Sequence, residues 1–155
     1  MTQETPWYHD VVMPALLRHA RTTYGKAMRE ALEAAGYDDL PANGLYIIGG
    51  LAMGAGGVPI RQLMRDLSIT KQGAGQLVDT LVARGYLVRT PDENDRRQLI
   101  VTLTERGRAA AETQAVARAK VDAALLARVG ETDMAAARRT LAALIDIRRE
   151  AAEEA

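Results

Sequence analysis

The stretch over residues 60–107 constrains the fold of this chain more than any other. It contains two short segments in which apolar residues recur at the spacing of one helix face. They are Ile60, Leu63, Met64 and Leu67 in the first segment, and Ala74, Leu77, Val78 and Leu81 in the second. Only residues 68–70 separate the two segments. We therefore expect a tight turn there, with Thr70 as the N-cap of the second helix and Gly85 just beyond its end.

Two strand-forming runs come next, over residues 86–90 and 98–103, and residues 91–97 between them combine turn formers with charge. Two helices on a short turn, the second with a polar outer face, form the helix-turn-helix arrangement that can enter a DNA major groove. A hairpin directly after it is a wing. Its basic tip can reach along the DNA backbone or into the minor groove.

The N-terminal part of the chain is predicted to be helical. Thr5 and Pro6 form a helix-start signal, and Pro14 either kinks that helix or starts it afresh. The apolar spacing is regular over residues 15–35. A second helix is expected over residues 42–53, where a pair of glycines either permits close packing or weakens the helix. Beyond the loop over residues 54–57, Val58 is expected to make a one-residue bridge to the wing.

Two further helices are predicted after the wing. The first runs over residues 104–129 and ends at Gly130; the second begins near Thr132 and Asp133, before a frayed acidic tail over residues 150–155. These helices and the N-terminal one have long, Ala-rich apolar stripes. The stripes fit either an intramolecular bundle or a self-complementary dimer interface. We favour the dimer, because a helix-turn-helix that reads a palindrome needs two-fold symmetry.

The predicted fold is therefore mainly α with a small β-hairpin wing, in a single domain over residues 1–155. Residues 41–107 form the winged helix-turn-helix lobe, and residues 6–36 and 104–152 form the helical dimerisation region.

Composition and charge exclude several classes of protein. The chain has no Cys, which removes disulfides, cysteine-based redox sensing and thiolate metal sites. No stretch approaches about 20 consecutive apolar residues and no signal peptide is visible, so we expect a soluble, cytoplasmic protein with no membrane partner. The net charge is zero, but residues 61–108 hold nine basic and six acidic side chains. This modest surplus predicts weak non-specific DNA binding and a need for two copies acting together.

The segment VDTLVARGYLVRTPDENDRRQLIVTLTERG, over residues 78–107, resembles the end of the recognition helix, the wing and the signature of the MarR family of winged-helix transcription regulators. The positions that match the signature are Asp95, Arg97, Leu103, Thr104 and Gly107. The resemblance is close from Pro59 to Gly107 and looser in the flanking helices. It implies a homodimer that binds a pseudo-palindromic operator, usually as a repressor, and that a small aromatic or anionic effector often releases.

The resemblance also implies roles for single residues. The helix over residues 70–82 would lie in the major groove, Arg97 would reach the minor groove, and Arg89 and Asp95 would order the wing. The predicted DNA-binding residues are Thr70, Lys71, Gln72, Gly73, Gln76, Arg96 and Arg97. Gln can pair with adenine, and Lys can reach phosphate or guanine. The glycines at positions 73 and 75 depart from the family pattern; they remove contacts but permit a close backbone approach to DNA.

Simpler explanations stay open for these residues. The two glutamines also fit a solvated helix face, and Arg96 and Arg97 also fit a charged turn that balances nearby acids. A winged helix can serve as a protein-interaction module or as an effector-independent DNA-architectural module, and these are the alternative functions.

A candidate ligand pocket is formed by aromatic side chains where the N-terminal helix meets the DNA-binding lobe, although the same side chains also suit a core. They are Trp7, Tyr8, Tyr24 and Tyr46. His9 and His19 lack the converging carboxylates of a metal site. The sequence contains no nucleophile–base pair, and the glycine run over residues 54–57 lacks the Lys and Ser/Thr of a phosphate loop. We therefore predict no catalytic residues, metal or cofactor.

Overall fold

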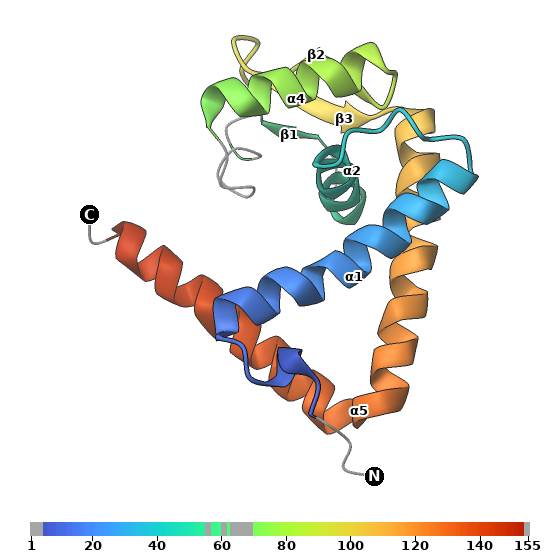
Figure 1. The fold of residues 1–155 in the computed structure, drawn as a ribbon. Helices are drawn as coiled ribbons and strands as arrows, with labels where there is room; N and C mark the ends of the chain where they lie inside the picture. Colours follow the sequence, from blue (N-terminus) through green and yellow to red (C-terminus); the bar gives the residue numbers. More distant parts are fainter. Residues whose placement is uncertain (1–4, 55–56, 60–61, 63–69, 154–155) are drawn as a thin grey trace. The chain divides into compact units, whose positions relative to one another are not determined.

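The computed structural model describes residues 5–54, 57–59, 62 and 70–153, and it is mainly helical with a small sheet (Figure 1). In chain order the elements are the 3-10 helix η1 (Trp7–His9), α1 (Met13–Ala34), α2 (Gly44–Met53), β1 (Val58–Pro59), α4 (Lys71–Ala83), β2 (Leu87–Pro91), β3 (Leu99–Leu103) and α5 (Glu105–Glu153). This confirms the predicted fold class. Apart from residue 62, the helix expected over residues 60–67 lies outside the described residues.

The N-terminal helix starts later than the Thr5-Pro6 signal predicted. Those residues lead only into η1, and Pro6 at its N-cap position makes no side-chain capping bond. The long helix α1 begins at Met13, with Pro14 in its first turn. Proline fits there because the first N–H groups of a helix have no partner within the helix. Pro14 therefore starts the helix afresh rather than kinking it.

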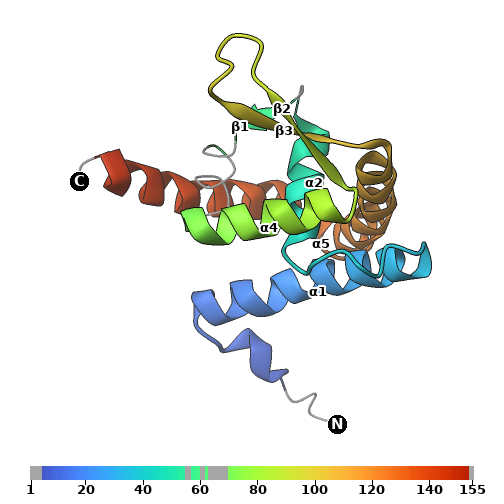
Figure 2. The ribbon, with the colours of Figure 1, turned by 90° about the horizontal axis from the view of Figure 1, so that it is seen from above.

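Three antiparallel strands form the sheet, in the order β1-β3-β2. Val58 pairs with Val101 and Pro59 with Ile100, so the expected one-residue bridge is a two-residue strand. In the wing, β2 and β3 pair from Leu87 opposite Leu103 to Pro91 opposite Leu99. The sheet contacts α4 through β2 and α2 through β3 (Figure 2). These contacts fix where the wing stands beside α4.

The hydrophobic core lies where α1, α2, α4, the sheet and the start of α5 meet. Its fully or nearly fully buried apolar side chains include Leu32, Ile47, Ile48, Val78, Leu81, Tyr86, Leu87, Val101 and Ala110. Burying a side chain of this size contributes about 1.5–3 kcal/mol relative to leaving it exposed. The core therefore holds the apolar face of α4 firmly and leaves its other face to solvent.

The two adjacent glycines of α2, Gly49 and Gly50, differ in how closely other side chains approach them. A Cβ built at Gly49 would lie 2.5 Å from Nε2 of Gln114, whereas a Cβ at Gly50 would meet nothing within 4 Å. Gln114 is 2% exposed and donates Nε2–H to the carbonyl oxygen of Leu45 at 2.9 Å. Close packing of α2 on α5 is therefore confirmed at the first glycine and does not apply to the second.

The contacts divide the chain into two compact units, Met1–Arg118 and Ala119–Ala155. The first holds α1, α2, the sheet, α4 and the beginning of α5; the second holds the rest of α5. Gly130 has φ 81° and ψ 169°, outside the helical region, so α5 is kinked there as predicted. The helix continues to Glu153, which corrects the expected fraying from residue 150. Within the described ranges, no helix has both the length and the hydropathy to span a membrane.

Candidate nucleic-acid interface

Both ends of α4 are fixed by local hydrogen bonds. At the start, Thr70 Oγ1 accepts the backbone N–H of Gly73 at 3.1 Å, which confirms Thr70 as the N-cap. At the end, Gly85 has φ 77°, a conformation that glycine adopts without strain. The N–H of Gly85 then bonds to the carbonyl of Val82, and that of Tyr86 to the carbonyl of Leu81. The helix is therefore a well-bounded rod of 13 residues, from Lys71 to Ala83.

The two faces of α4 differ sharply in burial. Ala74, Val78 and Leu81 are at most 1% exposed and face the core. Gln72, Gln76 and Asp79 are exposed to solvent. Amide side chains that stand free on a helix surface can present donor and acceptor together to a base edge.

The two glycines of α4 are not equivalent. A Cβ at Gly73 would lie 3.2 Å from Thr70 Oγ1, so a side chain there would press on the N-cap. A Cβ at Gly75 would meet nothing within 4 Å. Glycine at position 73 therefore preserves the start of the helix as well as permitting a close backbone approach.

The tip of the wing is ordered by two aspartates. Asp92 Oδ1 accepts the backbone N–H of Asn94 at 2.8 Å, and Asp95 Oδ1 accepts that of Arg97 at 3.1 Å. Asp95 Oδ2 also accepts from Gln98 Nε2 at 3.4 Å. The carboxylate of Asp95 thus bonds to the backbone N–H of Arg97 and to the side chain of Gln98.

The side chains of Arg96 and Arg97 are exposed at this tip. Within the part of the chain that the structure describes, neither guanidinium group has a hydrogen bond or ion-pair partner. The tip therefore combines an ordered backbone with two cations that are open to a partner from outside the chain.

Arg89 lies in strand β2 of the wing. It pairs with Val101, two positions below the last pair of the wing ladder, and so stands away from the tip that Asp95 orders. Its Nη2 forms an ion pair with Asp79 Oδ1 of α4. Since α4 contacts β2, the pair links the middle of the wing ladder to the exposed face of the helix. Sequence spacing did not indicate Asp79 as the partner of Arg89, and the wing-ordering role of Arg89 stays a prediction.

The four aromatic residues of the predicted pocket lie in two separate groups. Trp7, 62% exposed, packs edge-on against Tyr8 and against the ring of His19. Tyr46 of α2 accepts Arg21 Nε–H at 3.1 Å, with the guanidinium carbon of Arg21 4.5 Å from the ring centroid. Tyr24 packs against the core. None of these four residues lines the cavity between α2, β3 and α5 or the cavity beside α4.

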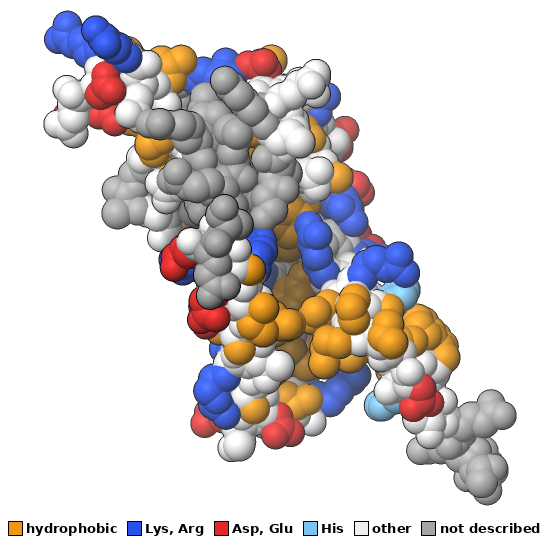
Figure 3. Space-filling model, turned by 90° about the vertical axis from the view of Figure 1, so that its left-hand side faces the viewer, with side chains coloured by type: hydrophobic (Ala, Val, Ile, Leu, Met, Phe, Trp, Pro, Cys, Tyr) orange, Lys and Arg blue, Asp and Glu red, His pale blue; other side chains and the backbone are white. Residues whose placement is uncertain are grey.

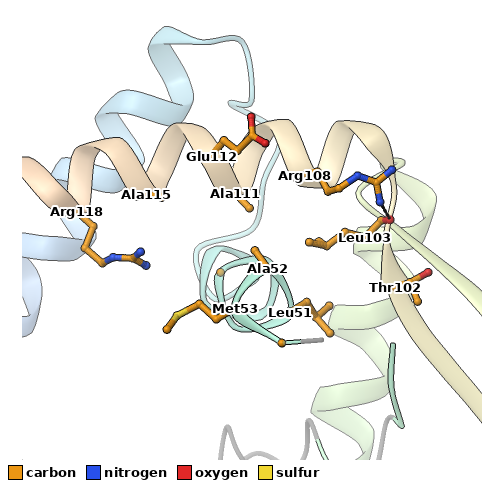
Figure 4. A pocket seen from close by; sticks show the side chains of 12 residues that line it. Leu51, Ala52, Met53, Thr102, Leu103, Arg108, Ala111, Glu112, Ala115 and Arg118 are labelled. Carbon is orange, nitrogen blue, oxygen red and sulfur yellow. Dashed lines mark hydrogen bonds between the residues drawn. The ribbon is translucent and has the colours of Figure 1, made fainter. Parts of the chain in front are cut away.

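The first cavity, of about 580 Å³, lies between α2, β3 and the first turns of α5 (Figure 4). Leu51, Ala52, Met53 and Leu103 give it an apolar wall, and Arg108 and Arg118 bring positive charge. Arg108 donates Nη1–H to the carbonyl of Leu103 at 2.9 Å. Among the described residues Arg118 has no such partner, and in Figure 4 its guanidinium reaches toward α2 while the Glu112 carboxylate points away from it.

A second cavity, of about 530 Å³, runs beside the exposed face of α4. Its lining includes Asn43 at the start of α2 and Gln76, Thr80 and Arg84 of the α4 segment. Sequence reasoning missed both cavities, because each is built from segments that are far apart along the chain. Of the residues that line the second cavity, the sequence had marked Gly73 and Gln76, both as predicted DNA-binding residues.

Comparisons with known proteins show what this chain is similar to. A model of the MarR family matches residues 38–98. The uncharacterized HTH-type transcriptional regulator YwhA of Bacillus subtilis (strain 168) is 29% identical over 104 residues, which cover 67% of this chain and 74% of the relative.

Two solved structures share the fold. The Staphylococcus aureus MepR–DNA complex superimposes with a TM-score of 0.73 at 17% identity, covering 88% of this chain and 98% of MepR. NadR in complex with 4-hydroxyphenylacetate gives a TM-score of 0.72 at 21% identity, covering 93% of this chain and 97% of NadR. This chain is therefore similar to the MarR family of winged-helix transcriptional regulators over residues 38–98, and it shares the fold of MepR and NadR.

Proposed function

We propose that this regulator binds a specific duplex DNA site by laying the polar face of α4 in the major groove while the wing tip reaches the neighbouring minor groove. The observation that carries the proposal is the pairing of two features. The helix α4 is capped at both ends and anchored by its apolar face, with Gln72 and Gln76 free to solvent. Beside it stands a wing whose tip carries Arg96 and Arg97, both exposed and without an ion-pair partner among the described residues. The fold shared with the MepR–DNA complex supports this reading.

The residues then take distinct roles. Gln72 and Gln76 read base edges, with adenine the natural partner of their amides. Thr70, Lys71 and Gly73 lie at the N-terminal turn of α4, where the positive end of the helix dipole favours a phosphate. Arg97 enters the minor groove, where narrow A·T-rich segments attract arginine, and Arg96 contacts the backbone.

The ion pair between Asp79 and Arg89 keeps the wing in register with α4. An unpaired carboxylate on the DNA-facing side of the helix would repel phosphate. Pairing it with Arg89 neutralises that charge and at the same time ties the middle of the hairpin to α4. Both effects favour binding, and they explain an acidic residue on this face.

Two copies of the chain would place two α4 helices about one DNA turn apart on a pseudo-palindromic site, as a repressor does. Exposed apolar side chains offer surfaces for this association (Figure 3). In the second unit they are Leu125, Leu126, Val129, Leu141, Leu144, Ile145 and Ile147. In the first unit, Trp7, Val12 and Met13 are each at least 51% exposed.

The first cavity is the candidate effector site. An apolar wall beside the guanidinium of Arg118, which has no partner among the residues that the structure describes, suits a small molecule that has a hydrophobic body and a carboxylate. NadR was solved with a ligand of this chemistry, 4-hydroxyphenylacetate. We infer that such a ligand binds between α2 and α5 and weakens DNA binding. Arg118→Ala should weaken the affinity for this probe about ten- to 150-fold, the loss of one charge-assisted hydrogen bond. Arg29→Ala, an exposed arginine on α1, is the control.

The DNA-binding proposal is tested by selecting bound sequences from a random duplex pool and then measuring affinity at several salt concentrations. The selection should return a short symmetric site with half-sites about one turn apart. On that site Arg97→Ala should reduce the slope of log K against log salt by about one, while Arg29→Ala should not. Bound DNA without a shared sequence would contradict specific recognition and favour an architectural role.

A further inference from the structure

Three segments that are distant in sequence meet in one polar cluster at the C-terminal end of α4. We call it the junction cluster: Asp39 from the loop between α1 and α2, Arg84 and Tyr86 from the end of α4, and Arg106 from the start of α5. All four belong to the first compact unit. None of them was among the residues that the sequence marked for DNA binding or wing ordering.

Asp39 is the centre of this cluster. Its Oδ1 accepts from the hydroxyl of Tyr86 and, at 2.9 Å, from Arg106 Nη2. Its backbone carbonyl accepts from Arg84 Nη1. Arg106 also donates to the Tyr86 hydroxyl at 3.1 Å, and its guanidinium carbon lies 4.7 Å from the centroid of that ring. A single loop residue thus holds side chains from both helix ends.

The backbone reinforces the same junction. The N–H of Thr104 bonds to the carbonyl of Tyr86 at 3.1 Å, and Thr104 Oγ1 donates to the carbonyl of Gly85 at 2.5 Å. A Cβ at Gly107 would collide with the Tyr86 carbonyl, so only glycine allows α5 to start so close to the end of α4. Tyr86 itself is fully buried, with only its hydroxyl joining the polar cluster.

The position of this anchor matters for DNA binding because α4 acts as a lever. Gln72 lies 12 residues from Arg84, which is about 18 Å along a helix. A tilt of about 5° at the anchored end would therefore move the amide of Gln72 by about 1.5 Å. A displacement of that size exceeds what a bidentate contact to a base edge tolerates.

We propose that Asp39 and Tyr86 are positioning residues for DNA recognition: together with Arg106 they fix the orientation of α4 against the start of α5, and so place Gln72 and Gln76 for base contact. The proposal rests on the proposed function. It assigns to the cluster a role in affinity for the specific site, beyond its contribution to folding.

The charge states of Asp39 and Tyr86 favour a hydrogen-bonded cluster that persists near neutral pH. The hydrogen bond from Tyr86 and the guanidinium of Arg106 hold the pKa of Asp39 below its ordinary value. Burial, followed by the hydrogen bond to Asp39, raises the pKa of Tyr86 to about 12. The groups that face this cluster are the guanidinium groups of Arg84 and Arg106 and the ring of Tyr37. Near neutral pH the carboxylate therefore stays charged and the tyrosine stays a donor.

The test uses Tyr86→Phe, Asp39→Asn and the double variant, in the full chain and on the selected operator. Tyr37→Phe is the matched control. Its ring also packs on Arg106 and Tyr86, but its hydroxyl has no hydrogen bond to the described residues. Each single variant should weaken specific binding about three- to thirtyfold, as coupled positions do, while Tyr37→Phe stays within twofold. The double variant should bind the operator no more weakly than the weaker of the two single variants, because both substitutions remove the same hydrogen bond between Tyr86 and Asp39.

Thermal melting of each variant separates positioning from folding. The proposal is overturned if Tyr86→Phe lowers the melting temperature but binds the operator like the wild type, or if the two substitutions lose affinity additively. Asp39→Asn carries the same test should the tyrosine variant not fold. A wild-type chain that binds no specific DNA would refute the proposed function instead, so the two failures are distinguishable.

Discussion

Replacing Gly49 with Ala should destabilise the protein, although alanine is the better helix former. The new Cβ would lie 2.5 Å from Gln114 Nε2, whereas ordinary contacts begin near 3.4 Å. Gln114 is 2% exposed and bonded to the Leu45 carbonyl, so it cannot swing into solvent. Overpacking of this kind costs about 1–3 kcal/mol. Straining or losing the amide hydrogen bond destabilises the folded state by about 1 kcal/mol more, whereas the better helix propensity of Ala stabilises it by about 1 kcal/mol.

The net expectation is a loss of about 1–3 kcal/mol in the free energy of unfolding. Gly50→Ala is the matched control, one residue away in the same helix. Its Cβ meets nothing within 4 Å, so only the gain in helix propensity remains, and it should stabilise by up to about 1 kcal/mol. Urea denaturation at one fixed protein concentration measures both. If Gly49→Ala stabilises as much as Gly50→Ala, the described packing of α5 on α2 is wrong.

Other predictions concern the charged groups and the kink. In a double-mutant cycle measured by electrophoretic mobility shift, Asp79→Ala and Arg89→Ala should each weaken operator binding, and the second substitution should add little to the first. Additive losses of affinity would contradict a shared role in holding the wing. Tyr86 should titrate near pH 12 in an ultraviolet titration, later than exposed tyrosines near pH 10, and because the folded state holds its proton more tightly, stability should fall as pH rises from about 10 to about 12. Because the pKa of Asp39 is lowered in the folded state, Asp39 should contribute to the free energy of unfolding above about pH 4, and this contribution should be lost as the pH falls below that value. Asp39→Asn should therefore flatten the acid side of the curve of stability against pH. An unchanged acid side would argue against the cluster. Gly130→Ala should destabilise the chain by about 1 kcal/mol in thermal melting, because its φ of 81° strains any residue with a Cβ.

Elements whose causes are local could be predicted from the sequence. The N-cap at Thr70 depends on a hydroxyl three residues before the N–H that it accepts. The ends of α1 and α4 and the kink at Gly130 depend on single residues with special backbone preferences. The wing follows from two strand-forming runs around a charged turn. The family resemblance drawn from residues 59–107 is confirmed by the family match over residues 38–98.

Contacts between distant segments could not be predicted in the same way. The partner of Arg89 is set by how α4 leans on β2, so Asp79, ten residues away, was not apparent from spacing. Asp39 reaches Arg106 across 67 residues, and no local pattern marks either one. The cavity between α2 and α5 could not be predicted either, because its lining residues Met53, Leu103 and Arg118 come from segments that only the fold brings together.

The predicted aromatic pocket illustrates a further limit. Residue type alone indicated that Trp7, Tyr8, Tyr24 and Tyr46 favour a ligand site, yet aromatic rings serve equally well as packing groups. Tyr46 is occupied by Arg21, and Tyr24 packs on the core. A role in ligand binding for these four residues stays a prediction, while the cavity near Arg118 offers the better-defined chemistry.

The central claim is that the exposed amides of α4 read DNA bases. Its most direct test is to repeat the selection from a random duplex pool with Gln72→Ala, with Gln76→Ala and with the wild type. Each variant should lose preference at one base position in each half-site, symmetrically, with about a five- to 150-fold loss of affinity for the wild-type sequence. If both variants select the same sequence as the wild type with the same strength at every position, α4 does not read the site through these residues.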